Sequence, residues 1–207
     1  MFKKSLLLLL LTPLISQADI YATSVTSIIR GSVPGDFPGF YGGDLSSFPV
    51  ALTSAQAEAA VLGAPDNDFL SLTGAPATGN GFQGAYVEVS FGTNFGANTL
   101  LNIWELGDNS ESAQLFLWTS NGGNIQTSFT RGTNDLYTLD LSIYSAALAG
   151  LGGEFTKVGI GGLDVLGASK GFDLDAVSIS SVPVPAAVLL FGSGLLGLAS
   201  LRRRHQV

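Results

Sequence analysis

The sequence predicts an all-β fold, a jelly-roll β-sandwich, on two observations. Short runs with apolar side chains at every second position recur along the middle of the chain, which is the pattern of strands buried on one face. Clusters rich in glycine and asparagine, such as residues 121–124, separate these runs and mark turns. Because no long segment carries the helical period, a sandwich or jelly roll is favoured over a parallel α/β sheet.

Five runs are predicted as strands: residues 21–29, 86–91, 100–105, 114–118 and 172–179. Alternation in the first run predicts one shared face for Tyr21, Thr23, Val25, Ser27 and Ile29. One helix is predicted over residues 54–62, with Ser54 as its N-cap and Gly63 just past its end. A second short helical turn is expected at residues 143–148, and no internal repeat is present.

Residues 1–18 have the layout of a secretory signal peptide. Two lysines precede a short apolar core over residues 6–15, and Ser16 and Ala18 supply the small residues of a cleavage site. The core is too short for a good membrane span. We therefore expect export by the Sec machinery, with cleavage between Ala18 and Asp19, and a mature body that begins at Asp19.

Residues 182–207 combine a proline pair, an apolar run and a basic end. The run of residues 186–201 is shorter than the about 20 residues that a span needs. Residues 182–185 can add depth, and the terminal arginines can extend toward the lipid headgroups. We expect a single C-terminal transmembrane helix that anchors the exported precursor, with the arginines on the cytoplasmic side.

This tail resembles a PEP-CTERM sorting tail in three places: Pro183-Val184-Pro185, the run Phe191-Gly192-Ser193-Gly194-Leu195, and the basic stop Arg202, Arg203 and Arg204. Such tails occur on exported proteins of Gram-negative bacteria that make extracellular polysaccharide. The resemblance implies an exosortase as a partner, a membrane transpeptidase that recognises the Pro-x-Pro element and cuts near it. Val184 stands where the family usually has Glu, which bears on the choice of exosortase.

The body between the two removable ends, residues 19–181, is strongly acidic. It holds four basic and sixteen acidic residues, a net charge of −12. Such a surface repels nucleic acid, so nucleic-acid binding is excluded. The chain has no cysteine, and its single histidine, His205, lies beyond the apolar run. The body therefore lacks any Ser-His or Cys-His catalytic group and any histidine zinc site.

A second resemblance covers roughly residues 62–180. The order of the segments 62–67, 87–91, 103–111, 158–160 and 171–177 is similar to that of the jelly-roll ectodomain often found ahead of this tail. The closing Asp-x-Asp strand also resembles the last strand of galactose-binding-like, carbohydrate-binding jelly rolls. That resemblance implies a structural calcium ion held by carboxylates from the first and last strands.

Residue chemistry favours the same cofactor. In a regular strand Asp173 and Asp175 share the face of Val177 and Ile179, where unpaired carboxylates would be costly to bury. Calcium takes oxygen ligands and would remove that cost. The predicted calcium ligands are Asp173, Asp175, Asp66, Asp68, Glu105 and Glu111. The alternative is that these acids are solvated turn residues, where aspartate is common.

Catalysis is not expected. A glycosidase needs two carboxylates that flank a bond, and Glu105 and Glu111 could take those roles, but no spacing selects them among sixteen acidic residues. Several aromatics could form a sugar-stacking surface or belong to the core: Trp104, Trp118, Tyr137, Tyr144, Phe40 and Tyr41. Trp118 is expected to be more exposed than Trp104.

The sequence as a whole predicts a protein exported to the cell surface, outer envelope or extracellular matrix. Its expected role is structural or adhesive, in a biofilm or exopolysaccharide matrix, with the membrane and extracellular polysaccharide among its partners. The alternative is a calcium-dependent, lectin-like carbohydrate-binding module with a defined pocket.

Overall fold

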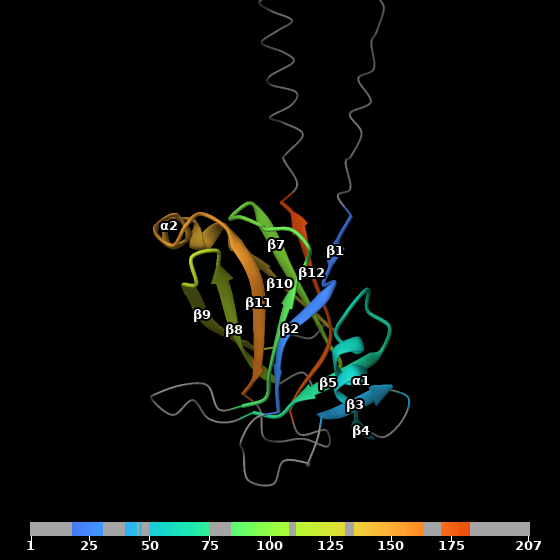
Figure 1. Ribbon diagram of the computed structural model, residues 1–207. Helices are drawn as coiled ribbons and strands as arrows, with labels where there is room; N and C mark the ends of the chain where they lie inside the picture. The colour runs from blue at the N-terminus through green and yellow to red at the C-terminus, as the bar shows by residue number, and fades with distance from the viewer. Residues whose placement is uncertain are drawn as a thin grey trace, which may run out of the picture. The chain divides into compact units, whose positions relative to one another are not determined.

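Strands dominate the part of the chain that the computed structural model describes, residues 18–30, 40–44, 46, 50–74, 84–107, 111–130, 135–163 and 171–182. In chain order they are β1 (Ile20–Tyr21), β2 (Ser24–Ile29), β3 (Phe40–Asp44), β4 (Val50–Leu52), β5 (Asp68–Leu72), β6 (Tyr86–Ser90), β7 (Thr99–Glu105), β8 (Ser112–Thr119), β9 (Asn124–Thr130), β10 (Leu136–Asp140), β11 (Phe155–Gly162) and β12 (Phe172–Ser181). Short helices are α1 (Ser54–Ala59), η1 (Leu141–Tyr144) and α2 (Ser145–Gly150). The all-β prediction is confirmed (Figure 1).

Two antiparallel sheets form a sandwich-like arrangement. The seven-stranded sheet has the order β10-β7-β12-β5-β3-β4, with β1 also paired to β12. The five-stranded sheet has the order β2-β6-β11-β8-β9. Strand β12 is central to its sheet, because it pairs with β7, β5 and β1. The last strand of the body is therefore paired with its first strand, β1, as well as with β5 and β7.

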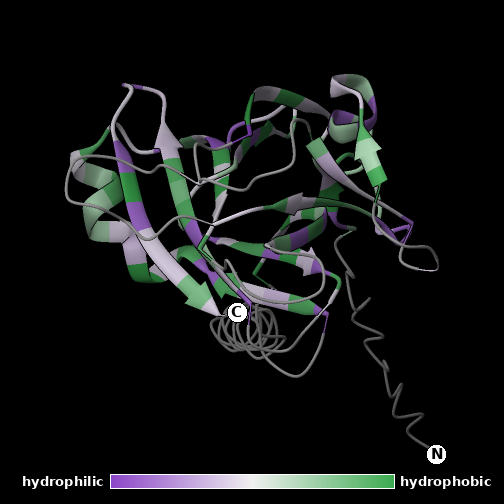
Figure 2. Cartoon of the chain, turned by 90° about the horizontal axis from the view of Figure 1, so that it is seen from below, coloured by the Kyte–Doolittle hydropathy of each residue, from purple (hydrophilic) through white to green (hydrophobic). Residues whose placement is uncertain are grey.

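The hydrophobic core lies between the inner faces of the sheets. Val87 of β6 and Leu115 of β8 meet Leu101 of β7 and Val177 of β12 there, and none is more than 1% exposed. In Figure 2 hydrophobic and hydrophilic segments alternate along the strands, as expected when one face is buried. All core residues lie between Ala22 and Ile179, within the compact unit of residues 18–181. This body has its own core and can be tested alone.

The strand predicted over residues 21–29 is divided between the two sheets. The Ala22 N–H donates to the Val177 carbonyl in one sheet, and the Thr23 N–H donates to the Ser90 carbonyl in the other, at 2.9 Å each. The chain thus crosses the sandwich at this point. A bulge between Val25 and Ser27 then interrupts the alternation. The predicted common face does not form.

The N-cap of the first helix lies one residue earlier than predicted. Thr53, not Ser54, is the N-cap: its hydroxyl accepts the Gln56 N–H, and the Gln56 side chain accepts the Thr53 N–H. Both residues suit a cap, but only Thr53 has glutamine three positions on, which completes the reciprocal pair. The helix ends at Ala59, ahead of the predicted Leu62. The second helical turn is confirmed by η1 and α2.

The membrane prediction concerns residues that the structure does not describe. The apolar run 186–201 lies outside the described ranges. Within those ranges no helix has the length and apolar character to cross a membrane.

Candidate functional site

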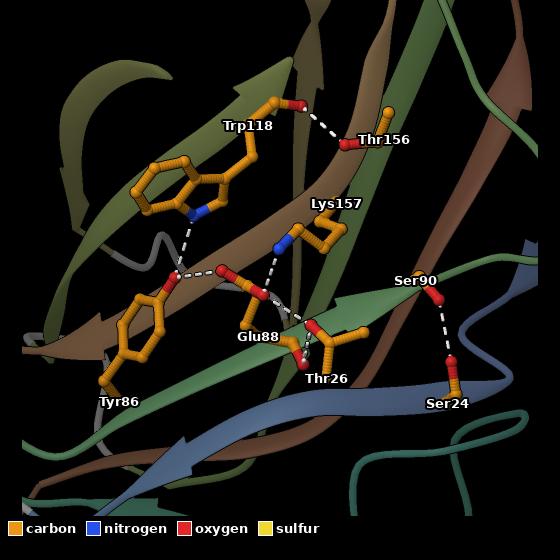
Figure 3. Close-up of polar contacts among 8 residues, drawn as sticks. All are labelled: Ser24, Thr26, Tyr86, Glu88, Ser90, Trp118, Thr156 and Lys157. Atoms are coloured by element: carbon orange, nitrogen blue, oxygen red, sulfur yellow. Dashed lines mark hydrogen bonds and ion pairs between the residues drawn. The ribbon is translucent and has the colours of Figure 1, made fainter. Parts of the chain in front are cut away.

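The outer face of the five-stranded sheet carries a cluster of polar and aromatic side chains. Alternation turns Val87 and Val89 into the core, and it turns Tyr86 and Glu88 outward on β6. Trp118 of β8 and Lys157 of β11 reach the same face, and Thr26 of β2 completes the group (Figure 3). We refer to Thr26, Tyr86, Glu88, Trp118 and Lys157 as the β-face cluster.

Glu88 is the centre of the β-face cluster. Its side chain accepts from three neighbours, although only 7% of the residue is exposed. The Lys157 ammonium lies 2.7 Å from Oε1, and the Thr26 hydroxyl donates to the same oxygen. The Tyr86 hydroxyl donates to Oε2 at 3.1 Å. A carboxylate with three donors on three strands, β2, β6 and β11, is held in one rotamer.

The same network orients the two aromatic rings. The Trp118 indole N–H donates to the Tyr86 hydroxyl oxygen at 2.9 Å, and the Lys157 ammonium lies 5.8 Å from the centre of the Trp118 ring. Tyr86 also makes an edge-to-face contact with Phe116, with ring centres 5.3 Å apart. The position of the Tyr86 ring requires a glycine at position 159, because a Cβ there would lie 2.1 Å from the hydroxyl oxygen of Tyr86.

Electrostatics keeps this cluster in one protonation state at neutral pH. Burial raises the pKa of Glu88, but hydrogen bonds from Lys157, Thr26 and Tyr86, together with the Lys157 charge, outweigh burial, so the pKa lies below its usual value. Burial raises the pKa of Tyr86 well above its usual value, and the Glu88 charge adds to this effect. Glu88 and Lys157 therefore form a charged pair, and Tyr86 stays a neutral donor.

The predicted calcium ligands separate into two groups. Glu105, Glu111 and Asp173 form the first group, and each is at most 2% exposed. A Cβ at Gly107 would lie 3.2 Å from an oxygen of Glu105 and 3.4 Å from one oxygen each of Glu111 and Asp173. The three carboxylates thus converge on one point beside the glycine.

Asp175 belongs to the second group, with the Asp66–Asp68 turn. The Asp66 N–H donates to its carboxylate at 3.2 Å. Burial raises the pKa of Asp175 to about 6, the N–H groups of Asp66 and Asn67 act in the opposite direction, and the Asp66 and Asp68 charges add to the rise. Asn67 has a φ of 73°, a left-handed conformation that asparagine tolerates and that allows the turn to approach β12.

A bulge explains why the predicted acidic face of β12 does not form. The register of β12 against β7 shifts between Leu174 and Ala176. Leu174 and Val177, three positions apart, therefore both enter the core. The predicted common face, made of Asp173, Asp175, Val177 and Ile179, is interrupted here, because alternation restarts after the bulge.

The described residues do not form the single calcium site that the sequence predicts. No three acidic, histidine or cysteine side chains in the described ranges have the geometry to hold a metal ion. Calcium binding itself stays a prediction, and a melting experiment tests it. Bound calcium is expected to raise the free energy of unfolding by about 2.7 kcal/mol at a hundredfold excess over its dissociation constant, and so to raise the melting temperature. Glu105→Gln should remove the rise. Equal melting temperatures in calcium and in chelator would contradict it.

The raised pKa of Asp175 predicts a pH dependence of stability. Because the folded carboxyl binds its proton more tightly than the unfolded one, its stabilising contribution is complete below about pH 4 and is lost as the pH rises through about 6. Asp175→Asn is therefore expected to raise the free energy of unfolding at pH 7, by about 1 kcal/mol, and to leave it unchanged at pH 4. Urea unfolding at both pH values measures this. A change in the free energy of unfolding that is equal at the two pH values would contradict the predicted pH dependence.

The other predicted aromatics have different positions. Trp104 lies 5.6 Å from Tyr21, centre to centre, on the seven-stranded sheet. Tyr137 stacks on the core residue Phe129 at 4.3 Å, and Tyr144 and Phe40 also pack against the core. Trp118 and Trp104 are both half-buried, and their relative exposure stays a prediction.

Sequence reasoning missed most of the β-face cluster. The predicted strand over residues 86–91 does place Tyr86 and Glu88 on one face, and a glutamate between two valines is a signal that could have been used. Lys157 and Thr26 could not be assigned, because they lie on strands far away in the sequence. Ala18 and Asp19 of the predicted cleavage site are exposed, whereas residues 183–185 and 202–204 lie outside the described ranges.

Comparisons with known proteins leave the family open. No protein-family model matches the chain, and no curated protein sequence matches it. One similar solved structure is a truncated AlyQ with CBM32 and alginate lyase domains, at 9% sequence identity and a TM-score of 0.39. The match covers 80% of this chain and 34% of that one, so this chain spans about a third of its length.

Proposed function

We propose that this chain is an exported, non-catalytic adhesive protein that binds neutral polysaccharide through the outer face of its five-stranded sheet. The observation that carries the proposal is the β-face cluster, in which Glu88 holds Tyr86 and Trp118 in fixed orientations on a solvent-facing sheet. Export by Sec and sorting by an exosortase are part of the same proposal, and they rest on the two ends of the sequence.

Pre-oriented aromatic rings suit a sugar ligand. A pyranose ring has an apolar face of C–H groups and a rim of hydroxyls, so it stacks on an aromatic ring and hydrogen-bonds to polar groups around it. Uncharged hydrogen-bonding side chains also lie beside the cluster on this face: Gln114 on β8 and Asn124 on β9. A ring that is already fixed loses little conformational entropy on binding.

Charge favours a neutral polysaccharide. Within the cluster Lys157 is committed to Glu88 at 2.7 Å, so the pair adds no net charge to the face. The body around it carries a net charge of −12. An anionic polymer such as a polyuronate would be repelled by that field, whereas a neutral chain is unaffected.

Burial of the acids supports a non-catalytic role. Glu105 and Glu111, the pair that could serve a glycosidase, are 1% and 2% exposed. A glycosidic bond must fit between the two carboxyl groups, and a polymer cannot reach side chains this deeply covered.

Affinity electrophoresis of the body, residues 19–181, tests the proposal. Gels contain a soluble β-glucan, a mannan, a galactan or a polyuronate. We expect at least one neutral polymer to retard the protein and the polyuronate to have no effect. Trp118→Ala should weaken the retardation more than tenfold, since a central aromatic contact contributes about 2 kcal/mol. Tyr86→Phe should have a smaller effect in the same direction, because it frees the indole but keeps the ring.

Trp104→Ala is the matched control. It removes the same side chain from the other sheet and should bind like the parent protein. Retardation lost equally in both tryptophan variants, or absent with every neutral polymer, would reject the binding face.

A further inference from the structure

The outer strands of the two sheets differ in how their free edges are protected. Strand β2 carries a bulge between Val25 and Ser27, and Arg30 follows it. Strands β1 and β4 have two and three residues. Strand β10 has Asp135 before it and ends on Asp140. Bulges, short strands and charges are the features by which sheet edges avoid pairing with other chains.

Strand β9 is neither bulged nor short, and it carries no charge within it, although Arg131 follows it in the sequence. All seven of its residues, Asn124–Thr130, pair with β8 in an unbroken register from Trp118 to Ser112. It contains no charged residue and no proline, and neither does β8. Gln126, Ser128 and Thr130 are exposed. Among the described residues no strand pairs with its outer side.

We propose that the β9 edge pairs antiparallel with the β9 edge of a second copy of this chain. The two β9 strands would be related by a two-fold axis that lies between them and is perpendicular to the sheet. Such an interface is self-complementary, since each edge offers the same row of N–H and C=O groups to the other. The uncharged side chains of β9 and β8 also suit this partner. Two bodies of net charge −12 repel each other over most of their surface, and they meet at lowest electrostatic cost along an uncharged edge.

The dimer goes beyond the proposed function and has a consequence for it. Pairing at β9 joins two five-stranded sheets into one continuous sheet of ten strands. The β-face clusters of both copies then lie on the same surface of that sheet, because the face of a sheet is preserved across a strand pair related by a perpendicular two-fold axis. One polysaccharide chain can contact both, which raises the effective affinity without a new contact.

Sedimentation equilibrium of the body over a concentration series tests the interface. We expect the parent protein to show a dimer fraction that rises with concentration. The double variant Gln126→Lys/Ser128→Lys places like charges opposite each other on an exposed edge and should stay monomeric throughout. The control Val50→Lys/Ile143→Lys adds the same charge at exposed positions on other elements and should dimerise like the parent. If the double variant does not fold, the single variant Gln126→Lys takes its place in this experiment.

Charge complementation identifies the partner. An equimolar mixture of the lysine variant with Gln126→Glu/Ser128→Glu should restore a dimer that neither variant forms alone. A parent protein that is monomeric at every concentration overturns the proposal, and so does a lysine variant that dimerises normally. The monomeric variant should still bind a short neutral oligosaccharide as the parent does. Failure of the dimer is therefore distinguishable from failure of the binding face.

Discussion

Gly162→Ala is expected to destabilise the body by about 3 kcal/mol or more. Gly162 ends β11 in the five-stranded sheet, and a Cβ there would lie 1.7 Å from the carbonyl oxygen of Leu72, which ends β5 in the other sheet. Backbone cannot rotate away as a side chain can, so the two sheets would have to separate at this corner. Forced overpacking of this kind usually costs about 1–3 kcal/mol, and a backbone clash lies at the upper end. Urea unfolding at neutral pH measures the change.

Two other glycines are the controls for this effect. A Cβ at Gly96 or Gly150 meets no atom within 4 Å, and neither residue has a left-handed φ. Gly96→Ala and Gly150→Ala should therefore change the free energy of unfolding by no more than about 0.5 kcal/mol. If Gly162→Ala unfolds at the same urea concentration as these two, the close approach of β11 and β5 is not real.

Phe172→Ala is the second change with a large expected effect. Phe172, at the start of β12, is fully buried, and its ring meets Phe129 of β9 edge-on at 5.4 Å. Phe129 in turn stacks on Tyr137 of β10 at 4.3 Å, so these rings join both sheets along one side of the sandwich. Removing the Phe172 ring leaves a cavity that the rigid strands cannot close. The expected loss is about 4 kcal/mol in the free energy of unfolding.

Leu136→Ala tests whether burial is the cause. Leu136 of β10 is apolar, like Phe172, but 40% of it is exposed. Its replacement should cost less than about 0.5 kcal/mol. Thermal unfolding of both variants compares them directly, and a similar loss in the two would mean that burial of Phe172 is not the cause of its effect.

Local patterns predicted the elements better than their boundaries. The strands at residues 86–91, 100–105 and 114–118 follow from alternation alone, because each has one face in the core. The run at residues 21–29 was misjudged because alternation does not show where a chain leaves one sheet for another. Similarly, the bulge in β12 was invisible, since an extra residue in a strand is defined by its partner strand.

The candidate site depends even more on partners that are distant in sequence. Glu88 and Lys157 are 69 residues apart, and Glu88 and Thr26 are 62 apart. Nothing in the local sequence of β11 or β2 distinguishes these side chains from other polar residues on exposed strand faces. For the acids, spacing predicted that Asp173 and Asp175 act together, whereas Asp173 lies with Glu105 and Glu111, and Asp175 lies with Asp66.

The sequence by itself determined the all-β class, the acidity of the body, the exclusion of histidine chemistry and the expected export and sorting of the chain. These properties depend on composition and on local periodicity, which each segment carries independently of its neighbours. Only the tertiary structure decided that Glu88 orients Tyr86 and Trp118, that six acids form two groups, and that β9 lies at one edge of the five-stranded sheet. Each of these is a relation between strands that pair over long separations, and such pairing is set by the packing of the whole core and not by any one segment.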